Sequence, residues 1–138
     1  GWSLYFDESG RVTYLYNWFG HELTFLSSAH ALGAGSCTVS LLYRHEGGFG
    51  SGGIANLSVD EQLVSQKVIP ATVPVIYSMS GETFDVGRDT GSPVGPYPHN
   101  YEFNGRIIGV TLARLDEADK STKVAERRGI FKASLSSQ

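Results

Sequence analysis

Short runs of alternating apolar and polar residues, each ended by glycine, proline or acidic turn residues, constrain this fold more than any other feature of the sequence. The runs "WSLYF" and "VTYLYNWF" are rich in aromatic and β-branched residues, and "DESG" lies between them. Because strand side chains alternate between two faces, Val12, Tyr14 and Tyr16 share one face. Leu15 lies on the opposite face. This pattern predicts an antiparallel hairpin.

The same period of two continues through the middle of the chain. "HELTFLSS" and "CTVSLLYRH" predict two more strands, with Val39, Leu41 and Tyr43 on one face of the second. "IANLSV" and "QLVSQKVI" flank the turn residues at 60–61 and predict another hairpin. Proline cannot donate to a central ladder, so "PATVP" at 70–74 fits a sheet edge or a crossover.

The second half of the β region carries weaker strand signals. "VIYSM" and "TFDVG" are short strand candidates, and a proline-rich loop, "RDTGSPVGPYPHNYEFNG", follows them. "RIIGVTLARL" predicts a closing strand with Ile108, Val110 and Leu112 inward. Eight or nine short strands separated by glycine and proline turns are typical of an all-β, antiparallel β-sandwich.

The last segment differs in character from the rest. Residues 117–135 favour a helix, with Val124, Phe131 and Leu135 on one stripe. A chain of 138 residues that is 41% hydrophobic is long enough for one core. We therefore expect a β-sandwich domain over 1–115 and a helical tail over 116–138 that packs on it.

The stretch "HEGGFGSGG" (45–53) contains the spacing G-x-G-x-x-G, which occurs in dinucleotide-binding loops. Such a loop requires a helix directly after the glycines, because the helix N-terminus holds the phosphates. Here a strand of period two follows, and no Lys-Ser or Lys-Thr pair follows Gly53. The glycines are therefore interpreted as a connection between strands, where they allow positive φ and close backbone approach.

Charge and composition exclude several classes of partner. The net charge of −3 comes with no basic stripe, so nucleic acid is not an expected partner. No apolar run approaches the roughly 20 residues that span a bilayer, so we expect no membrane partner. Cys37 is the single cysteine, which leaves no disulfide framework or zinc spacing. We expect no cofactor.

The segment "FDVGRDTGS" places Asp85, Arg88 and Asp89 within five residues. An arginine between two carboxylates can order a loop through charge-assisted hydrogen bonds. Two functional alternatives stay open: Asp85 and Asp89 with nearby carbonyl groups as a calcium site, or Arg88 as the group that meets a sulfated or other anionic ligand. Two acids alone supply too few ligands for calcium.

Aromatic residues crowd the first nineteen positions, and Trp2, Tyr5 and Trp18 are the candidates for a contact surface. Exposed rings on a β-sandwich can stack on sugar rings, whereas buried rings fill a core or an interface. The sequence therefore leaves a glycan-binding surface and a packing role open. No G-x-S-x-G elbow marks a hydrolase nucleophile.

Four segments together resemble the C-terminal domain of bacterial-type arylsulfatases. They are "GWSLYFDESGRVTYLYNWFG", the "GGFGSGG" loop with the strand ending in "SVD", "PATVPVIYSMSGETFDVGRDTGSPV" and "YEFNGRIIGVTL". The similarity covers nearly the whole chain in the same order. It implies a jelly-roll or concanavalin-like β-sandwich appended to a sulfatase catalytic domain.

The resemblance does not imply sulfatase activity in this chain. The sulfatase nucleophile arises in a C/S-x-P-x-R pattern, and Cys37 lies in "CTVSL" without the proline or the arginine. Our leading hypothesis is a noncatalytic accessory domain that packs on a sulfatase catalytic domain or on a second copy of the chain. The alternative is a free-standing, lectin-like carbohydrate-binding module.

Two departures from the family pattern lead to further expectations. This chain has Asp60 and Glu61 where the family has an Asp-Gly turn, so we expect a different turn geometry. The family domain also has strand sequence before the segment that begins at Gly1. A sheet without that strand has an open edge, so we expect a homodimer or strand exchange through the N-terminal hairpin.

Overall fold

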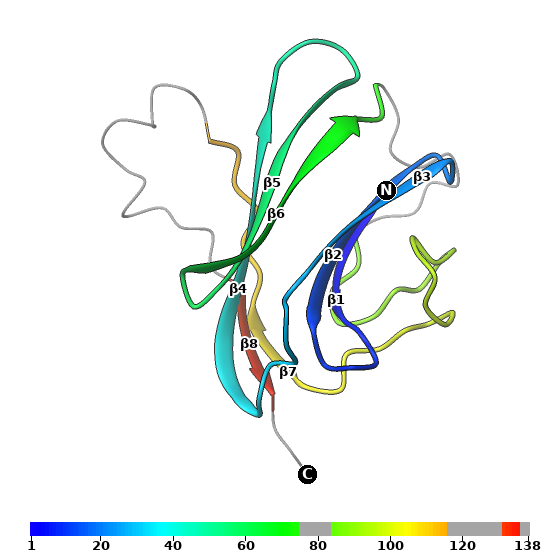
Figure 1. Ribbon diagram of the computed structural model, residues 1–138. Helices are drawn as coiled ribbons and strands as arrows, with labels where there is room; N and C mark the ends of the chain where they lie inside the picture. The colour runs from blue at the N-terminus through cyan, green and yellow to red at the C-terminus, as the bar shows by residue number, and fades with distance from the viewer. Residues whose placement is uncertain (75–83, 116–130, 136–138) are drawn as a thin grey trace.

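The computed structural model describes residues 1–74, 84–115 and 131–135, and for the last of these segments the backbone alone. The described chain is all-β and contains no helix, as Figure 1 shows. Its strands are β1 (Trp2–Phe6), β2 (Val12–Trp18), β3 (Glu22–Ser27), β4 (Gly35–His45), β5 (Ser51–Val59), β6 (Gln62–Ala71), β7 (Arg106–Gly109) and β8 (Phe131–Leu135).

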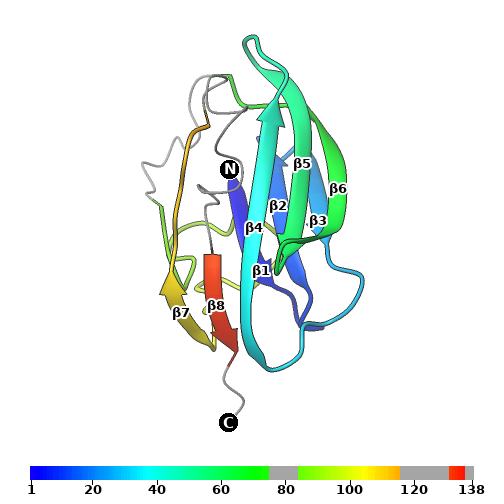
Figure 2. The same ribbon diagram turned by 90° about the vertical axis from the view of Figure 1, so that its left-hand side faces the viewer.

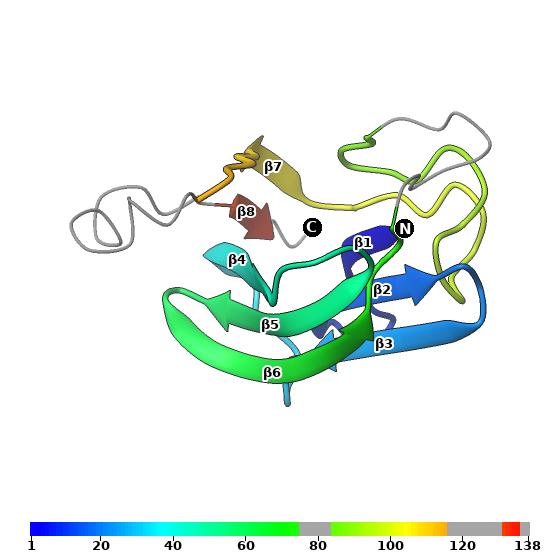
Figure 3. The same ribbon diagram turned by 90° about the horizontal axis from the view of Figure 1, so that it is seen from above.

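The strands form two antiparallel sheets. One has three strands in the order β1-β2-β3, and the other has five in the order β6-β5-β4-β8-β7. In Figure 2, β1, β2 and β3 lie behind β4, β5 and β6, whereas loops lie behind β7 and β8. Figure 3 shows the same two layers from above. Loops therefore cover the smaller sheet on the side of β1.

The predicted N-terminal hairpin is confirmed. Strands β1 and β2 pair from Trp2 opposite Tyr16 to Phe6 opposite Val12. The alternation also places Leu15 on the face away from the core cluster, yet Leu15 is fully buried. Both faces of β2 are thus covered, one by the larger sheet and the other by a loop described below.

The strands of the larger sheet follow the predicted alternation. Val39 and Leu57 face the core, and the second predicted hairpin forms between β5 and β6. Pro70 lies in β6, which is an edge strand, as its missing N–H requires. The core between the sheets consists of Val12, Tyr14, Tyr16, Leu26, Val39, Ala55, Leu57, Ile69 and Val73.

The glycine-rich stretch is the connection between β4 and β5, as interpreted from the sequence. Gly47, Gly48 and Gly50 have positive φ. The backbone N–H of Glu46 donates to the carbonyl of Gly52 across the turn (3.0 Å). The stretch joins two strands and precedes no helix, so it lacks the helix N-terminus that a phosphate site needs.

Two expectations in the second half of the β region are wrong. Residues 84–87 of "TFDVG" are irregular, because they turn into a loop; "VIYSM" lies outside the described residues. The inward positions of the closing strand are also shifted. Ile108 and Leu112 are 57% and 64% exposed, Val110 is half-buried, and Ile107 faces a cavity. A bulge between Ile107 and Gly109 produces this shift in register.

The prediction of a C-terminal helix is wrong for residues 131–135, which are the part of the predicted tail that the structure describes. Residues 131–135 form β8, which pairs antiparallel with β4 on one side and with β7 on the other. Insertion between two strands satisfies the backbone groups of the segment on both sides, and this outweighs a weak helical pattern. Val124 and the rest of the predicted tail lie outside the described residues.

The turn between β5 and β6 also differs from expectation. Asp60 and Glu61 have φ values of 46° and 69°, so the chain keeps the positive-φ geometry of an Asp-Gly turn without the glycine. The Asp60 N–H donates to the carbonyl of Thr38, and the Asp60 carboxylate accepts from the Thr38 N–H, both at 2.8 Å. These contacts with β4 hold the turn in place.

Candidate functional site

A cavity of about 910 Å³ opens where the loop of residues 84–104, here called the covering loop, lies against β1. The cavity contains the acidic and basic candidates from the sequence and two of the three aromatic candidates. Side chains from β1 and from the covering loop supply most of its rings. Its lining includes Trp2, Tyr5, Phe6, Phe84, Asp85, Arg88, Asp89, Tyr97, Tyr101, Glu102, Phe103 and Ile107.

The covering loop folds back on itself as a short two-stranded ribbon. The Asp89 N–H donates to the Tyr101 carbonyl (3.0 Å), and the Phe103 N–H donates to the Gly87 carbonyl (2.7 Å). Arg88 and Glu102 face each other in this ribbon as an isolated antiparallel bridge. These bonds bring the two ends of a proline-rich segment together.

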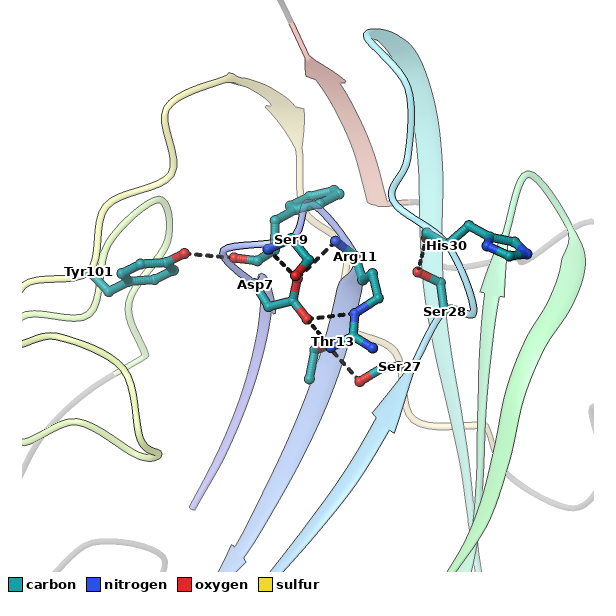
Figure 4. Close-up of polar contacts among 9 residues, drawn as sticks. Asp7, Ser9, Arg11, Thr13, Ser27, Ser28, His30 and Tyr101 are labelled. Carbon is teal, nitrogen blue, oxygen red and sulfur yellow. Dashed lines mark hydrogen bonds and ion pairs between the residues drawn. The ribbon is translucent and has the colours of Figure 1, made fainter.

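Three contacts attach the covering loop to the smaller sheet. The Asn17 amide donates to the Val94 carbonyl at 2.6 Å. Gly95 lies so close to Leu15 that a Cβ at this glycine would meet the leucine side chain at 2.0 Å, which explains the burial of Leu15. At the far end, Figure 4 shows the Tyr101 hydroxyl reaching the carbonyl of Phe6 (2.8 Å).

The two carboxylates of the predicted cluster order the covering loop through uncharged partners. Oδ2 of Asp85 accepts from the N–H (2.8 Å) and the hydroxyl of Thr90. These bonds, the one from the hydroxyl above all, lower the pKa of the exposed Asp85 carboxyl. Oδ2 of Asp89 accepts from the Tyr97 hydroxyl at 2.7 Å and from the Val94 N–H at 3.4 Å.

Arg88 does not play the role expected from its position between two acids. Its side chain is exposed, and in the described part of the chain it forms no ion pair with Asp85 or Asp89. Its charge contributes weakly to the lowered pKa of Asp85. The guanidinium therefore lines the cavity with its hydrogen-bond donors available. No group of three metal-ligating side chains occurs among the described residues.

The predicted aromatic set divides between two places. Trp2 lies against Phe84 with ring centroids 5.7 Å apart, and Tyr5 lies 4.9 Å from Tyr97. Trp18 is absent from the cavity lining and packs against Phe19 in the turn after β2. The early aromatics thus meet rings from a segment more than seventy residues later in the sequence.

Sequence reasoning missed the rings that the covering loop contributes. Tyr97 and Tyr101 lie 5.4 Å apart, and Phe103 stacks on Phe6 at the same centroid distance. The run "YPHNYEF" carries these three residues, and its density of aromatics between prolines was the available signal. Burial raises the pKa of Tyr97 to about 12 and also raises the pKa of Tyr101, which is consistent with packed rings.

Cys37 carries no sign of reactivity. It lies in β4, half-buried, with its backbone paired to Ala133 of β8. Burial raises the pKa of its thiol, and the negative charge of Asp60 acts in the same direction. A raised pKa keeps the group as a thiol near neutral pH, so it is a weak nucleophile.

In the described part of the chain, no helix is long and apolar enough to cross a membrane. Comparisons with models of protein families, with curated proteins and with solved structures found no match to this chain.

Proposed function

We propose that this chain is a noncatalytic accessory β-sandwich of the jelly-roll or concanavalin-like type, similar to the C-terminal domain of arylsulfatases, and that it packs on a sulfatase catalytic domain. The resemblance in four segments supports this proposal, and so does the absence of the sulfatase nucleophile pattern from the sequence. The two antiparallel sheets with a core between them are compatible with this fold.

The observation that carries the proposal is an outer face on β4, β5 and β6 that is mostly apolar and uncharged, with Arg44 at one end of it. Residues that alternate with the core positions of these strands point away from the smaller sheet. Leu42, Leu63 and Val68 on this face are 47%, 58% and 60% exposed. Most positions around them are uncharged (Thr38, Ser40, Ile54, Asn56, Ser58 and Gln66), and Arg44, opposite Ile54, is the charged residue on this part of the face.

An exposed face with this composition is suited to docking. The fully buried centres of protein interfaces are depleted of charged residues, and contiguous apolar surface on a soluble domain marks an interaction site. Ile54 lies opposite Val68 across the β5–β6 pair, and Leu42 is the diagonal neighbour of Ile54. Leu42, Ile54 and Val68 are thus contiguous, and the Asn56–Gln66 pair separates them from Leu63.

A catalytic domain is the better-supported of the two partners expected from the sequence. A second copy was expected to pair with the open edge of β1. The covering loop lies at that edge, with Tyr101 bound to the Phe6 carbonyl and Phe103 stacked on the Phe6 ring. A second copy would have to displace these contacts, whereas Leu42, Leu63 and Val68 on the outer face of β4–β6 are exposed.

The experiment measures binding of the purified chain to an arylsulfatase catalytic domain that lacks its own C-terminal domain, by calorimetry. We expect a complex, and we expect the double variant Leu42→Lys, Val68→Lys to weaken it at least about tenfold through two unpaired buried charges. The matched control is Ile108→Lys, Leu112→Lys, which changes equally exposed apolar residues elsewhere. Circular dichroism verifies that both variants fold.

Two results would overturn the proposal. One is the absence of any complex, and the other is an equal effect of both double variants. If the chain alone has twice its monomer mass in light scattering and Leu42→Lys, Val68→Lys restores the monomer, the face is an interface between two copies and not a site for a catalytic domain.

A further inference from the structure

We propose that the cavity beneath the covering loop binds a neutral saccharide. This inference is independent of the docking face on β4–β6, because none of Leu42, Leu63 and Val68 lines the cavity. Two separate features of the sequence, the early aromatics and the polar cluster at 85–89, converge on this one cavity.

The cavity has the size and the lining of a small-ligand site. Pockets for small ligands are about 300–1,000 Å³, mostly apolar and aromatic, with a few polar groups. The volume here is about 910 Å³. A second cavity of about 450 Å³ shares Arg88, Glu102 and Phe103 with it, so the ribbon borders both.

Aromatic rings at the cavity supply the apolar contacts that a sugar needs. The C–H faces of a pyranose pack on aromatic rings, so rings beside polar groups are a recurrent arrangement for saccharides. Phe84 is half exposed and lies beside Trp2. Tyr5 and Tyr97 are half-buried.

The charges at the cavity exclude strongly charged ligands. The acidic residues in the lining outnumber the basic ones, which repels a sulfated or carboxylated sugar. Arg88 in turn disfavours a cation. The Gly1 nitrogen donates to the Asn17 carbonyl (2.8 Å). The acids in the lining are Asp7, Glu8, Asp85, Asp89 and Glu102.

A mixture of free donors and acceptors fits neutral hydroxyl groups. The Arg88 guanidinium provides donors, and Asp85 uses Oδ2 for Thr90, which leaves Oδ1 as an acceptor within the described part of the chain. A sugar hydroxyl both donates and accepts, so it can bridge an arginine and a carboxylate without a net charge. This proposal differs from the sequence-based alternative in which Arg88 meets an anionic ligand.

The covering loop is already fixed, so binding would not require its folding. Its ribbon bonds, the Asn17–Val94 contact and the Tyr101–Phe6 contact hold it on β1. A pre-formed cavity loses less conformational entropy on binding than a mobile one.

The test titrates the full chain with cellohexaose, xylohexaose and laminarihexaose, and with a sulfated carrageenan hexasaccharide of similar length. Isothermal calorimetry gives the Kd, and quenching of tryptophan fluorescence, to which Trp2 at the cavity and Trp18 outside it both contribute, gives a second reading of binding. We expect binding of at least one neutral probe and weaker or no binding of the sulfated one.

Matched variants locate the site. Arg88→Ala should raise the Kd about tenfold, since a hydrogen bond to a charged group is lost. Phe84→Ala should raise it about fivefold. The controls are Arg44→Ala and Phe49→Ala, an exposed arginine on the outer sheet face and a phenylalanine 82% exposed in the β4–β5 connection. Both controls should leave the Kd unchanged.

Three outcomes would overturn the inference: no binding of any neutral probe at millimolar concentration, tighter binding of the sulfated probe, or a Kd that Arg88→Ala and Phe84→Ala leave unchanged. All four variants alter exposed side chains, so a folded protein is expected in each case. The saccharide titration and the docking experiment can fail independently, because the first tests Arg88 and Phe84 and the second tests Leu42 and Val68.

Discussion

At the scale of single residues, Asp7 shows how one side chain fixes a turn. Its Oδ1 accepts from the N–H groups of Ser9 (2.9 Å) and Arg11 (3.0 Å), and its Oδ2 pairs with the Arg11 guanidinium (Figure 4). Slight burial acts to raise the pKa of the Asp7 carboxyl, but the bonds from Arg11 and Ser9 outweigh it and lower the pKa. The turn then places β1 under the covering loop.

Asp7→Asn should therefore destabilise the protein in a pH-dependent way. Because the pKa in the folded state lies below the unfolded value of 3.8, the charge of Asp7 stabilises above that value and the effect is lost as pH falls. We expect a loss of about 1 kcal/mol at pH 7 and a smaller loss at about pH 3, where the unfolded-state carboxyl is mostly protonated. Urea unfolding at both pH values measures it, and an equal loss at both would contradict the assignment.

Glu61 occupies a backbone conformation that suits glycine. Its φ of 69° places it in the left-handed region, which costs a residue with a Cβ about 1–2 kcal/mol. Glu61→Gly removes this strain but increases the entropy of the unfolded chain. We expect a net gain of about 0.5 kcal/mol in the free energy of unfolding. A loss of stability would show that contacts of the Glu61 side chain matter more than its backbone.

At the scale of elements, the β4–β5 hairpin depends on glycine for close packing as well as for turning. A Cβ on Gly52 would lie 2.0 Å from the Ile69 carbonyl oxygen, and one on Gly53 would lie 2.2 Å from that of Arg44. Backbone atoms of neighbouring strands cannot move away without breaking the ladder. These two glycines therefore belong to the sheet and not to a ligand loop.

Gly52→Ala should cost about 3 kcal/mol or prevent folding. The control is Gly33→Ala, where a Cβ meets nothing within 4 Å and φ is not positive, so the change should be neutral or slightly stabilising. Thermal melts of the two variants beside the wild type provide the comparison. Similar melting temperatures for both alanine variants would rule out the steric argument.

One hydrogen bond in the covering loop depends on pH, because the hydroxyl that donates it can lose its proton. The Tyr97 hydroxyl donates to Asp89, and burial raises the pKa of Tyr97 from 10.0 to about 12. The protonated hydroxyl therefore stabilises fully below pH 10, and this contribution is lost as pH rises toward 12. Tyr97→Phe should cost about 1 kcal/mol at pH 7, with a gap to the wild type that narrows above pH 10. A gap that stays constant in alkaline urea melts would refute this.

At the scale of the whole molecule, the smaller sheet has fewer strands than the larger one, and the covering loop packs on β1 where a further strand would lie. The smaller sheet ends at β1. Gly1 and Asn17 exchange both backbone hydrogen bonds at the start of the β1–β2 ladder, and hydrogen-bonded pairs alternate along an antiparallel ladder. The N–H and C=O groups of Trp2 and Leu4 therefore point away from β2, toward the open edge. Rings of the covering loop stack on this strand in place of a further strand. The edge is thereby protected.

We predict that the chain alone is a monomer in light scattering and that Tyr101→Phe with Phe103→Ala makes its mass increase with concentration. The double variant removes the bond to the Phe6 carbonyl and the ring on Phe6, which leaves the edge of β1 open to another strand. A dimeric wild type would restore the strand pairing between copies expected from the sequence. A variant that stays monomeric would show that the rest of the covering loop is enough to protect the edge of β1.

Local patterns in the sequence were sufficient for much of the fold. The hairpins around 7–11 and 60–61, the inward faces of β2, β4 and β5, and the role of the glycine stretch follow from a period of two and from turn residues. Asp85, Arg88 and Asp89 were correctly grouped because they are neighbours in the chain, although Asp85 was predicted in a short strand and lies in the loop. These features depend on interactions between residues close in sequence.

The tertiary structure alone decided the rest. The segment at 131–135 became a strand because β4 and β7 pair with it on both sides, and the bulge in β7 turned Ile108 outward. The cavity exists because rings at 84–103 pack on rings at 2–6. Such contacts join residues far apart in the chain, and the free energy that selects them comes from burial and pairing across that distance, which no local pattern encodes.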